Sequence, residues 1–161
     1  MDAVKHPENL ELVRENTLLE HMTVRAAMLE LECRFEKAIK ANNLTVLLVP
    51  PSVAIELSDA EGLQLDRGGE MEACVKDIQG ADLCLVCVWA EPPRHYTLLK
   101  LEKEAGGELT ASYKDSLPKP SAPSLQRARS LLQNIRLLDL AEGLQATSPK
   151  FAQDDGWSCG L

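Results

Sequence analysis

The sequence predicts an α+β fold in which helices pack against an antiparallel or mixed sheet. A helical pattern, uninterrupted by proline or glycine, runs through residues 11–41 and fits one long helix or two abutting helices. A nearly continuous apolar run of strand length fills residues 82–89, and two further strand-like segments follow it after short turns. Three strands joined by short turns are typical of an antiparallel meander.

The composition is that of one acidic globular domain. The chain has 161 residues, of which 45% are hydrophobic and 26% are charged, so it can bury a substantial core. Its net charge is −8 and no basic stripe offsets that charge, so we expect no direct binding to nucleic acid. No apolar run approaches the roughly 18 residues of a membrane span. Residues 1–10 lack the apolar segment of a secretory signal, so we expect no membrane contact and an intracellular location, in the cytoplasm or the nucleus.

The first helix ends at the Asn42–Asn43 pair, which supplies a stop signal. We therefore divide the chain into an N-terminal helical segment, residues 1–43, and a main domain, residues 44–161. The main domain begins with a β-branched strand pattern that Pro50 breaks, because proline lacks the amide hydrogen of a sheet ladder. After this break the pattern fits either a short helix or a second extended piece.

The remaining elements follow from proline, glycine and apolar spacing. Residues 58–69 are rich in glycine and aspartate and form a loop, and residues 70–79 form a short helix. The apolar run at 82–89 is expected to be a central strand that is buried on both faces. Downstream of it, the expected elements are strands at 95–101 and 108–114, a connector at 118–123, a helix at 125–141 with Ser124 as its cap, and a polar loop at 145–156.

The five cysteines do not suggest a disulfide framework, because their number is odd and no secretory signal precedes them. Cys84 and Cys87 form a Cys-x-x-Cys pair, which can bind a metal or act in redox chemistry. The pair lies inside an apolar strand, where residues three apart point to opposite faces, and no second pair has zinc-ligand spacing. We therefore expect buried thiols here, and we expect the chain to use neither a metal nor another cofactor.

His95 is the histidine best placed for chemistry, because it opens a strand just after a Pro-Pro turn. Asp115 follows the end of the next strand, so if the two strands pair, both residues lie at one edge of the sheet. An aspartate there can orient an imidazole and stabilise its charged form. The structural alternatives are a histidine that only packs and an aspartate that only begins the Asp-Ser-Leu-Pro turn.

Cys159 lies in a Gly-Trp-Ser-Cys-Gly stretch near the end of the chain. A cysteine at the start of a helix has a lowered pKa, which favours the nucleophilic thiolate. Gly160 leaves room for a substrate backbone, and Gln153 can donate an amide hydrogen bond to an oxyanion. The structural alternative is a free cysteine in a disordered tail.

Together these residues resemble the active-site pattern of the ubiquitin-like-protease family, the SUMO-type cysteine peptidases related to the adenoviral protease. The stretches HYTLLKL, YKDSL and QDDGWSCG are each similar to the family's sequence around its site residues. The resemblance covers residues 45–161 and departs at Tyr96, where the family usually has tryptophan, and at Ser158, where it often has aspartate. The site residues that share the family's order are His95, Asp115, Gln153 and Cys159.

The resemblance implies a papain-like architecture and a Cys-His-Asp triad. Such a triad hydrolyses peptide or isopeptide bonds after the C-terminal tail of a ubiquitin-like modifier. His95 would activate Cys159 while Asp115 orients the imidazole, and Gln153 would stabilise the oxyanion. For Trp89 the structural alternative is a core side chain that ends a buried strand. The residues with implied substrate-binding roles are Trp89, Tyr96, Trp157 and Gly160.

In the family a buried helix continues after the cysteine, whereas this sequence ends at Leu161. The expectation is therefore a domain truncated just after the nucleophile, with a full set of site residues but an incomplete C-terminal helix. The same residues are also compatible with a catalytically impaired module that binds a modifier or another protein. A modifier protein or its conjugates would be the main partner in both cases.

Overall fold

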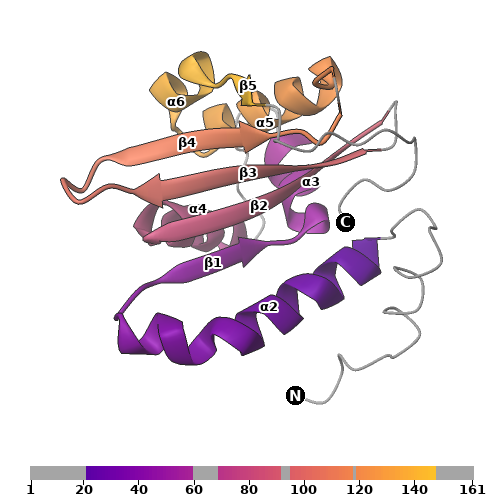
Figure 1. Cartoon of the computed structure of the whole chain (residues 1–161). Coiled ribbons are helices and arrows are strands. Elements are labelled where there is room, and N and C mark those ends of the chain that lie inside the picture. Colours follow the sequence, from indigo (N-terminus) through magenta and orange to yellow (C-terminus); the bar gives the residue numbers. More distant parts are fainter. Residues whose placement is uncertain (1–20, 60–68, 92–94, 118, 148–161) are drawn as a thin grey trace.

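The structure is a computed structural model that describes residues 21–59, 69–91, 95–117 and 119–147 (Figure 1). Within these ranges the chain forms helices and strands in mixed order. The helices are α2 (His21–Ala41), α3 (Pro51–Asp59), α4 (Glu70–Gly80), α5 (Ala122–Asn134) and α6 (Leu138–Gly143). The strands are β1 (Val46–Val49), β2 (Leu83–Ala90), β3 (His95–Lys103), β4 (Leu109–Lys114) and β5 (Ala146–Thr147).

The described strands form one sheet in the order β1-β2-β3-β4-β5. The three middle strands are the antiparallel meander that the sequence predicts. β1 pairs with β2 in parallel, and β5 pairs with β4 in parallel, so the sheet is mixed. The predicted α+β class is confirmed, and no described helix combines the length and the apolar character that a bilayer span requires.

One face of the sheet, which we call the core face, carries the main core. On β2 the side chains of Cys84, Val86 and Val88 are at most 1% exposed, whereas the residues between them are half-buried. The prediction of a strand buried on both faces is therefore wrong for β2. Helices α3, α4, α5 and α6 all contribute to the core on this face, and Figure 1 shows α3, α4 and α5 behind the sheet, with α2 in front.

Helix α2 covers part of the opposite face, which we call the outer face. Val24 of α2 packs with Cys87, Trp89 and Tyr96, which form a small cluster separate from the main core. The prediction of a long first helix is confirmed for residues 21–41, and the rest of the predicted span lies outside the described residues. Among the described helices, α2 alone packs on the outer face, whereas four helices pack on the core face.

The predicted helix at 125–141 is in fact two helices, because the chain leaves helical geometry at Arg136. This residue has a φ of 65°, in the left-handed region. Its N–H donates to the carbonyl of Gln133 at 2.9 Å, and the Leu137 N–H donates to the carbonyl of Leu132 at 2.8 Å. These two bonds are the Schellman arrangement that ends many helices. Glycine usually occupies the left-handed position, so an arginine there gave no stop signal in the sequence.

Helix α5 begins earlier than predicted. The Ser121 side chain accepts a hydrogen bond from the Ser124 N–H at 3.4 Å, so Ser121 is the cap, rather than Ser124. Pro123 lies in the first turn, where its missing amide hydrogen leaves no intrahelical bond unmade. The predicted connector is therefore shorter, because a proline near its end starts a helix instead of preventing one.

Two further segments differ from, or decide between, the sequence expectations. After the proline break the chain forms α3, so the short-helix alternative is correct, and Pro51 is its first residue. The predicted polar loop at 145–156 contains β5, whose Thr147 hydroxyl donates to the carbonyl of Tyr113 at 2.8 Å. Two residues are too few to produce an alternating pattern, which is why the sequence shows no strand there.

Candidate active site

His95 and Asp115 lie on the core face, at the edge of the sheet where β3 begins and β4 ends. In the β3–β4 ladder Leu98 pairs with Lys114. One residue further along both strands, Thr97 lies opposite Asp115. His95 is two residues from Thr97 on the same strand, so it lies diagonally across from Asp115. Because side chains alternate between faces, these three residues point to the same side as the core of both strands. The predicted pairing of the strands is confirmed, and it brings the two residues together.

The imidazole and the carboxylate are joined by a hydrogen bond. His95 Nε2 lies 2.6 Å from Asp115 Oδ1, and the two residues are 1% and 0% exposed. A carboxylate oxygen only accepts, so Nε2 is the nitrogen that carries the hydrogen. Nδ1 is then the nitrogen whose lone pair can take up a proton. In this arrangement the carboxylate can orient the imidazole and fix its tautomer.

Backbone donors hold the Asp115 carboxylate from its other side. The Leu117 N–H donates to Oδ1 at 2.9 Å, and the Ser121 N–H donates to Oδ2 at 2.7 Å. The bond to Leu117, two residues on, is the turn that the structural alternative for Asp115 predicted. The turn and the contact with the histidine are therefore compatible, because one oxygen of the carboxylate takes part in both.

A group of buried hydroxyls lies beside this pair. Tyr113 is fully buried on the core face, and among the described residues its oxygen finds no partner with good hydrogen-bond geometry. Burial raises the pKa of the Tyr113 phenol to about 12, the nearby hydroxyls of Thr97 and Ser124 oppose that rise, and the charge of Asp115 adds to it. The phenol therefore stays neutral beside the carboxylate, and it retains its hydrogen as a donor.

Trp89 and Tyr96, the two described residues with an implied substrate-binding role, are cross-strand partners on the outer face. Their ring centroids are 4.6 Å apart and the rings are inclined at 45°. Tyr96 is only 4% exposed, whereas Trp89 is half-buried, so Trp89 is the ring that has surface to offer. The carbonyl of Trp89 accepts a hydrogen bond from Arg127 Nη1 at 3.1 Å, which ties the end of β2 to α5.

The described cysteines fit structural roles. Burial raises the pKa of the Cys84 thiol to about 12, and burial also raises the pKa of Cys74, so neither side chain forms a thiolate readily. Cys84 lies in the core, whereas Cys87 packs on the outer face with Tyr96. The two members of the Cys-x-x-Cys pair therefore cannot share a ligand. The described residues contain no group of three metal-ligating side chains close enough to hold an ion.

Four of the predicted site residues lie outside the described residues: Gln153, Trp157, Cys159 and Gly160. The structure thus brings together the histidine and the aspartate of the predicted set, and the nucleophile and the oxyanion donor stay predictions.

The residues that the sequence analysis missed are backbone donors, chiefly the N–H of Ser121. A backbone group leaves no mark in residue type, but a serine between prolines and ahead of a helix pattern is a usable signal for a cap. Had Ser121 been recognised as the cap, the approach of the helix start to Asp115 could have been anticipated.

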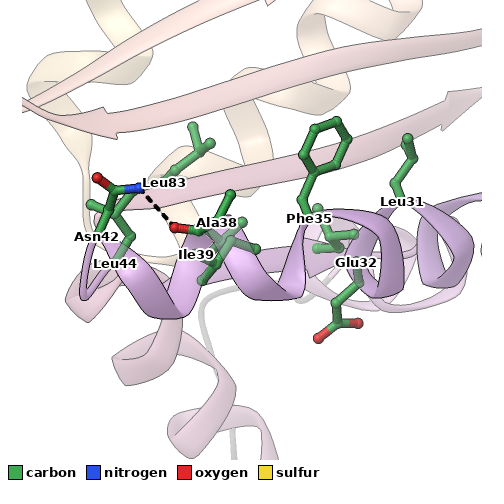
Figure 2. Close-up of a pocket in the computed structure, with 10 residues that line it drawn as sticks. Leu31, Glu32, Phe35, Ala38, Ile39, Asn42, Leu44 and Leu83 are labelled. Atoms are coloured by element: carbon green, nitrogen blue, oxygen red, sulfur yellow. Dashed lines mark hydrogen bonds between the residues drawn. The ribbon is translucent and has the colours of Figure 1, made fainter.

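An apolar hollow lies away from the histidine–aspartate pair, between α2 and the start of the sheet (Figure 2). Its volume is about 270 Å³. Leu31 and Phe35 extend from the same side of α2 and form part of its rim. The floor is apolar and comes from Val46, Leu48 and Leu83 of the outer face. With Glu32 as its one ionisable lining residue, the hollow has no set of groups suited to acid–base chemistry.

Comparison with solved structures shows that the chain has the fold of the ubiquitin-like protein proteases. No protein-family model and no curated protein matches the sequence itself. The structure of the effector protein XopD of Xanthomonas campestris, bound to ubiquitin, matches with a TM-score of 0.65 and 18% identity, over 89% of this chain and 69% of that one. A de-sumoylating protease matches with a TM-score of 0.62 and 12% identity, over 95% of this chain and 62% of that one.

A further structure of Xanthomonas XopD, described in terms of the substrate specificity of ubiquitin-like protein proteases, matches with a TM-score of 0.54 and 16% identity, over 80% of this chain and 70% of that one. At these identities the likeness concerns the fold. It confirms the fold that the resemblance in sequence implied.

Proposed function

We propose that this protein is a cysteine peptidase that hydrolyses peptide or isopeptide bonds after the C-terminal tail of a ubiquitin-like modifier. The observation that carries the proposal is the buried hydrogen bond of 2.6 Å between His95 Nε2 and Asp115 Oδ1. The fold around the pair is that of ubiquitin-like protein proteases. The sequence supplies the remaining residue types of the site, Gln153 and Cys159, in the order of the family pattern that it resembles.

In the proposed mechanism His95 acts as the general base through Nδ1. It takes the proton from the Cys159 thiol, and the thiolate attacks the carbonyl carbon of the scissile bond. The negative charge then moves to the carbonyl oxygen, where the side chain of Gln153 and the backbone N–H of Cys159 donate hydrogen bonds. His95 returns the proton to the leaving amine, which leaves an acyl-enzyme, and a water molecule releases the acid.

Asp115 makes the base effective without taking a proton itself. Its bond to Nε2 selects the tautomer in which Nδ1 is unprotonated, and its charge stabilises the imidazolium that forms in the reaction. Burial strengthens this effect, because the pair is shielded from water and its electrostatic interaction is less screened. The backbone donors to both carboxylate oxygens keep the aspartate oriented.

The proposed substrate is a modifier whose tail ends in Gly-Gly, because a slender tail can pass under an aromatic ring. Trp89 is proposed as that ring, and Tyr96 supports it from the neighbouring strand through the ring contact. Trp157 and Gly160 are proposed to complete the passage. A partner of this kind agrees with the XopD structure, which contains ubiquitin.

The test is covalent labelling by ubiquitin and SUMO probes that carry an electrophile at the C-terminus. The unmodified protein should form one adduct that survives denaturation, and Cys159→Ala and His95→Gln should both abolish it. Cys33→Ala is the matched control, because Cys33 is an exposed thiol on α2, and this variant should be labelled as the unmodified protein is.

Labelling that persists in Cys159→Ala would contradict the proposal, since another thiol would then be the nucleophile. Absence of labelling in the folded, unmodified protein would favour the alternative of a module that binds without cutting. Measuring the affinity of the same protein for unmodified ubiquitin and SUMO would then decide whether binding remains.

A further inference from the structure

Among the described residues, the buried polar side chains are concentrated at one place. They are Ser58, His95, Thr97, Asp115, Ser121 and Ser124, none of them more than 8% exposed. Ser58 lies in α3 and bonds to the Ile55 carbonyl of its own helix. The others lie on the edge of the core face where the histidine–aspartate pair sits. Buried polar groups oppose stability unless they are hydrogen-bonded, so their gathering here points to a shared role.

Ser121 connects this group to the aspartate. Its backbone N–H donates to Asp115 Oδ2 at 2.7 Å, the shorter of the two backbone bonds to this carboxylate. Its hydroxyl oxygen accepts from the Ser124 N–H at 3.4 Å and from the Ser124 hydroxyl at 3.0 Å. The side chain of Ser121 therefore caps the start of α5, and the backbone N–H of Ser121 holds one oxygen of Asp115.

The geometry of the carboxylate depends on both of its oxygens. Oδ1 is aimed at His95 Nε2, and the direction of Oδ1 changes if the carboxylate turns about its bond to the side chain. The bond from Ser121 to Oδ2 prevents that turn. The bond from Ser121 also ties the carboxylate to the first residues of α5, a 13-residue helix.

We propose that Ser121 is a positioning residue for the His95–Asp115 pair: through its N–H and its capping hydroxyl it locks the Asp115 carboxylate to the start of α5 and thereby holds His95 in the tautomer protonated at Nε2. Ser124 supports it by donating to its hydroxyl. The catalytic consequence rests on the proposed function, whereas the consequence for the tautomer of His95 does not.

Three substitutions at one position separate the parts of this proposal. Ser121→Thr keeps the N–H and the capping oxygen. Ser121→Ala keeps the N–H and loses the oxygen. Ser121→Pro loses both, although its backbone conformation fits, because the φ of Ser121 is −69° and proline prefers about −65°. The proline ring also occupies the space of the amide hydrogen, so Oδ2 must move away.

The first readout is the tautomer of His95, measured from the two ring nitrogen shifts of nitrogen-15-labelled histidine at a pH where the ring is neutral. The His95 signals are assigned by their loss in His95→Gln. The unmodified protein and Ser121→Thr should show the form protonated at Nε2, and Ser121→Pro should show a mixture of both forms. In Ser121→Ala the fraction of the form protonated at Nε2 should lie between that of the unmodified protein and that of Ser121→Pro.

The second readout is turnover of a modifier substrate with a fluorescent C-terminal group. Ser121→Pro should lower kcat at least about tenfold while KM changes little, because general-base catalysis contributes about 10² to 10⁴ in rate and Ser121 touches no substrate. Ser121→Ala should lower kcat to a smaller extent, and Ser121→Thr should restore it. Ser58→Ala is the matched control, since it removes a buried serine hydroxyl elsewhere and should leave kcat and the tautomer unchanged.

The outcomes are distinct. A His95 that is not protonated at Nε2 in the unmodified protein, or a tautomer that is the same in Ser121→Pro, would overturn the proposal. If Ser121→Pro does not fold, the pair Ser121→Ala and Ser121→Thr decides, and equal tautomer populations in the two would overturn it. If the protein turns over no substrate, the proposed function fails while the tautomer measurement still tests the role of Ser121.

Discussion

The two faces of the sheet differ in how completely they are covered. In the part of the chain that the structure describes, four helices enclose the core face, where residues such as Leu99 and Leu101 are fully buried. One described helix covers part of the outer face, and its residues Phe35 and Leu31 are 56% and 47% exposed. Stability therefore comes mainly from the core face, and the histidine–aspartate pair lies at the edge of that same face. The candidate site thus adjoins the more completely covered face of the described sheet.

The largest effect is expected when the buried aspartate is removed. Asp115→Ala leaves the N–H groups of His95, Leu117 and Ser121 without their acceptor, and loss of one partner of a buried pair costs about 3 to 5 kcal/mol in unfolding free energy. Denaturant unfolding followed by circular dichroism measures this loss. Asp77→Ala, at an exposed position of α4, should stay within about 0.5 kcal/mol of the unmodified protein. Equal stability of the two variants would mean that the donors find water instead.

The next largest change in unfolding free energy is expected from a leucine-to-alanine substitution, made once in a helix of each face. Leu131→Ala removes a fully buried side chain of α5 and should lower the unfolding free energy by about 2 to 5 kcal/mol, since a cavity remains. Leu31→Ala, at the rim of the apolar hollow, should cost less than about 1 kcal/mol, because nearly half of that side chain is already in contact with water. Unfolding curves of the two variants, measured side by side, test the comparison. Similar losses would show that the outer face is covered as well as the core face.

A smaller loss of unfolding free energy is expected at alkaline pH, and it comes from Cys84, which also lies on the core face. Burial raises the pKa of Cys84 from 9.0 to about 12, so the folded protein binds more protons than the unfolded chain above pH 9.0. The contribution of this neutral thiol to the unfolding free energy is fully present below pH 9.0 and is lost as the pH rises towards about 12. At about pH 10.5 the loss from this thiol should be about 1 to 2 kcal/mol. Tyr113, whose pKa is also raised to about 12, acts in the same direction.

Unfolding free energies at pH 8 and about 10.5 measure this loss. Cys84→Ala should show a smaller decrease between the two pH values than the unmodified protein. Cys33→Ala, which changes an exposed thiol, should show an unaltered decrease. A decrease in Cys84→Ala as large as in the unmodified protein would mean that Cys84 titrates normally in the folded state.

The smallest effect on stability is expected for Phe35→Lys. More than half of the phenylalanine is exposed, so its replacement should change the unfolding free energy by at most about 0.5 kcal/mol. The hollow is apolar, so the fluorescence of an added apolar dye should nevertheless fall, because a charge then stands at its rim. A stability loss above about 1 kcal/mol would show that Phe35 is covered in solution.

Several expectations from the sequence held because they rest on local patterns. The meander followed from the apolar runs and the short turns between them, and the site pair followed from the positions of His95 and Asp115 at the two ends of paired strands. The expectation of full burial for β2 failed because an apolar run does not report how many helices cover each face. The sequence does not indicate the helix break at Arg136, because the break depends on a backbone conformation that arginine rarely adopts.

The sequence by itself determined the α+β class, the pairing of β3 with β4 and the identity of the two residues that meet at their edge. These depend on side-chain alternation and turn length, which are properties of short segments. Tertiary structure alone decided which groups complete the site. The N–H of Ser121 reaches Asp115 only because α5 begins where β4 ends, and Val24 packs against Tyr96 only because α2 lies over the outer face. Contacts of this kind join segments far apart in the chain, and packing of whole elements, rather than local preference, sets them.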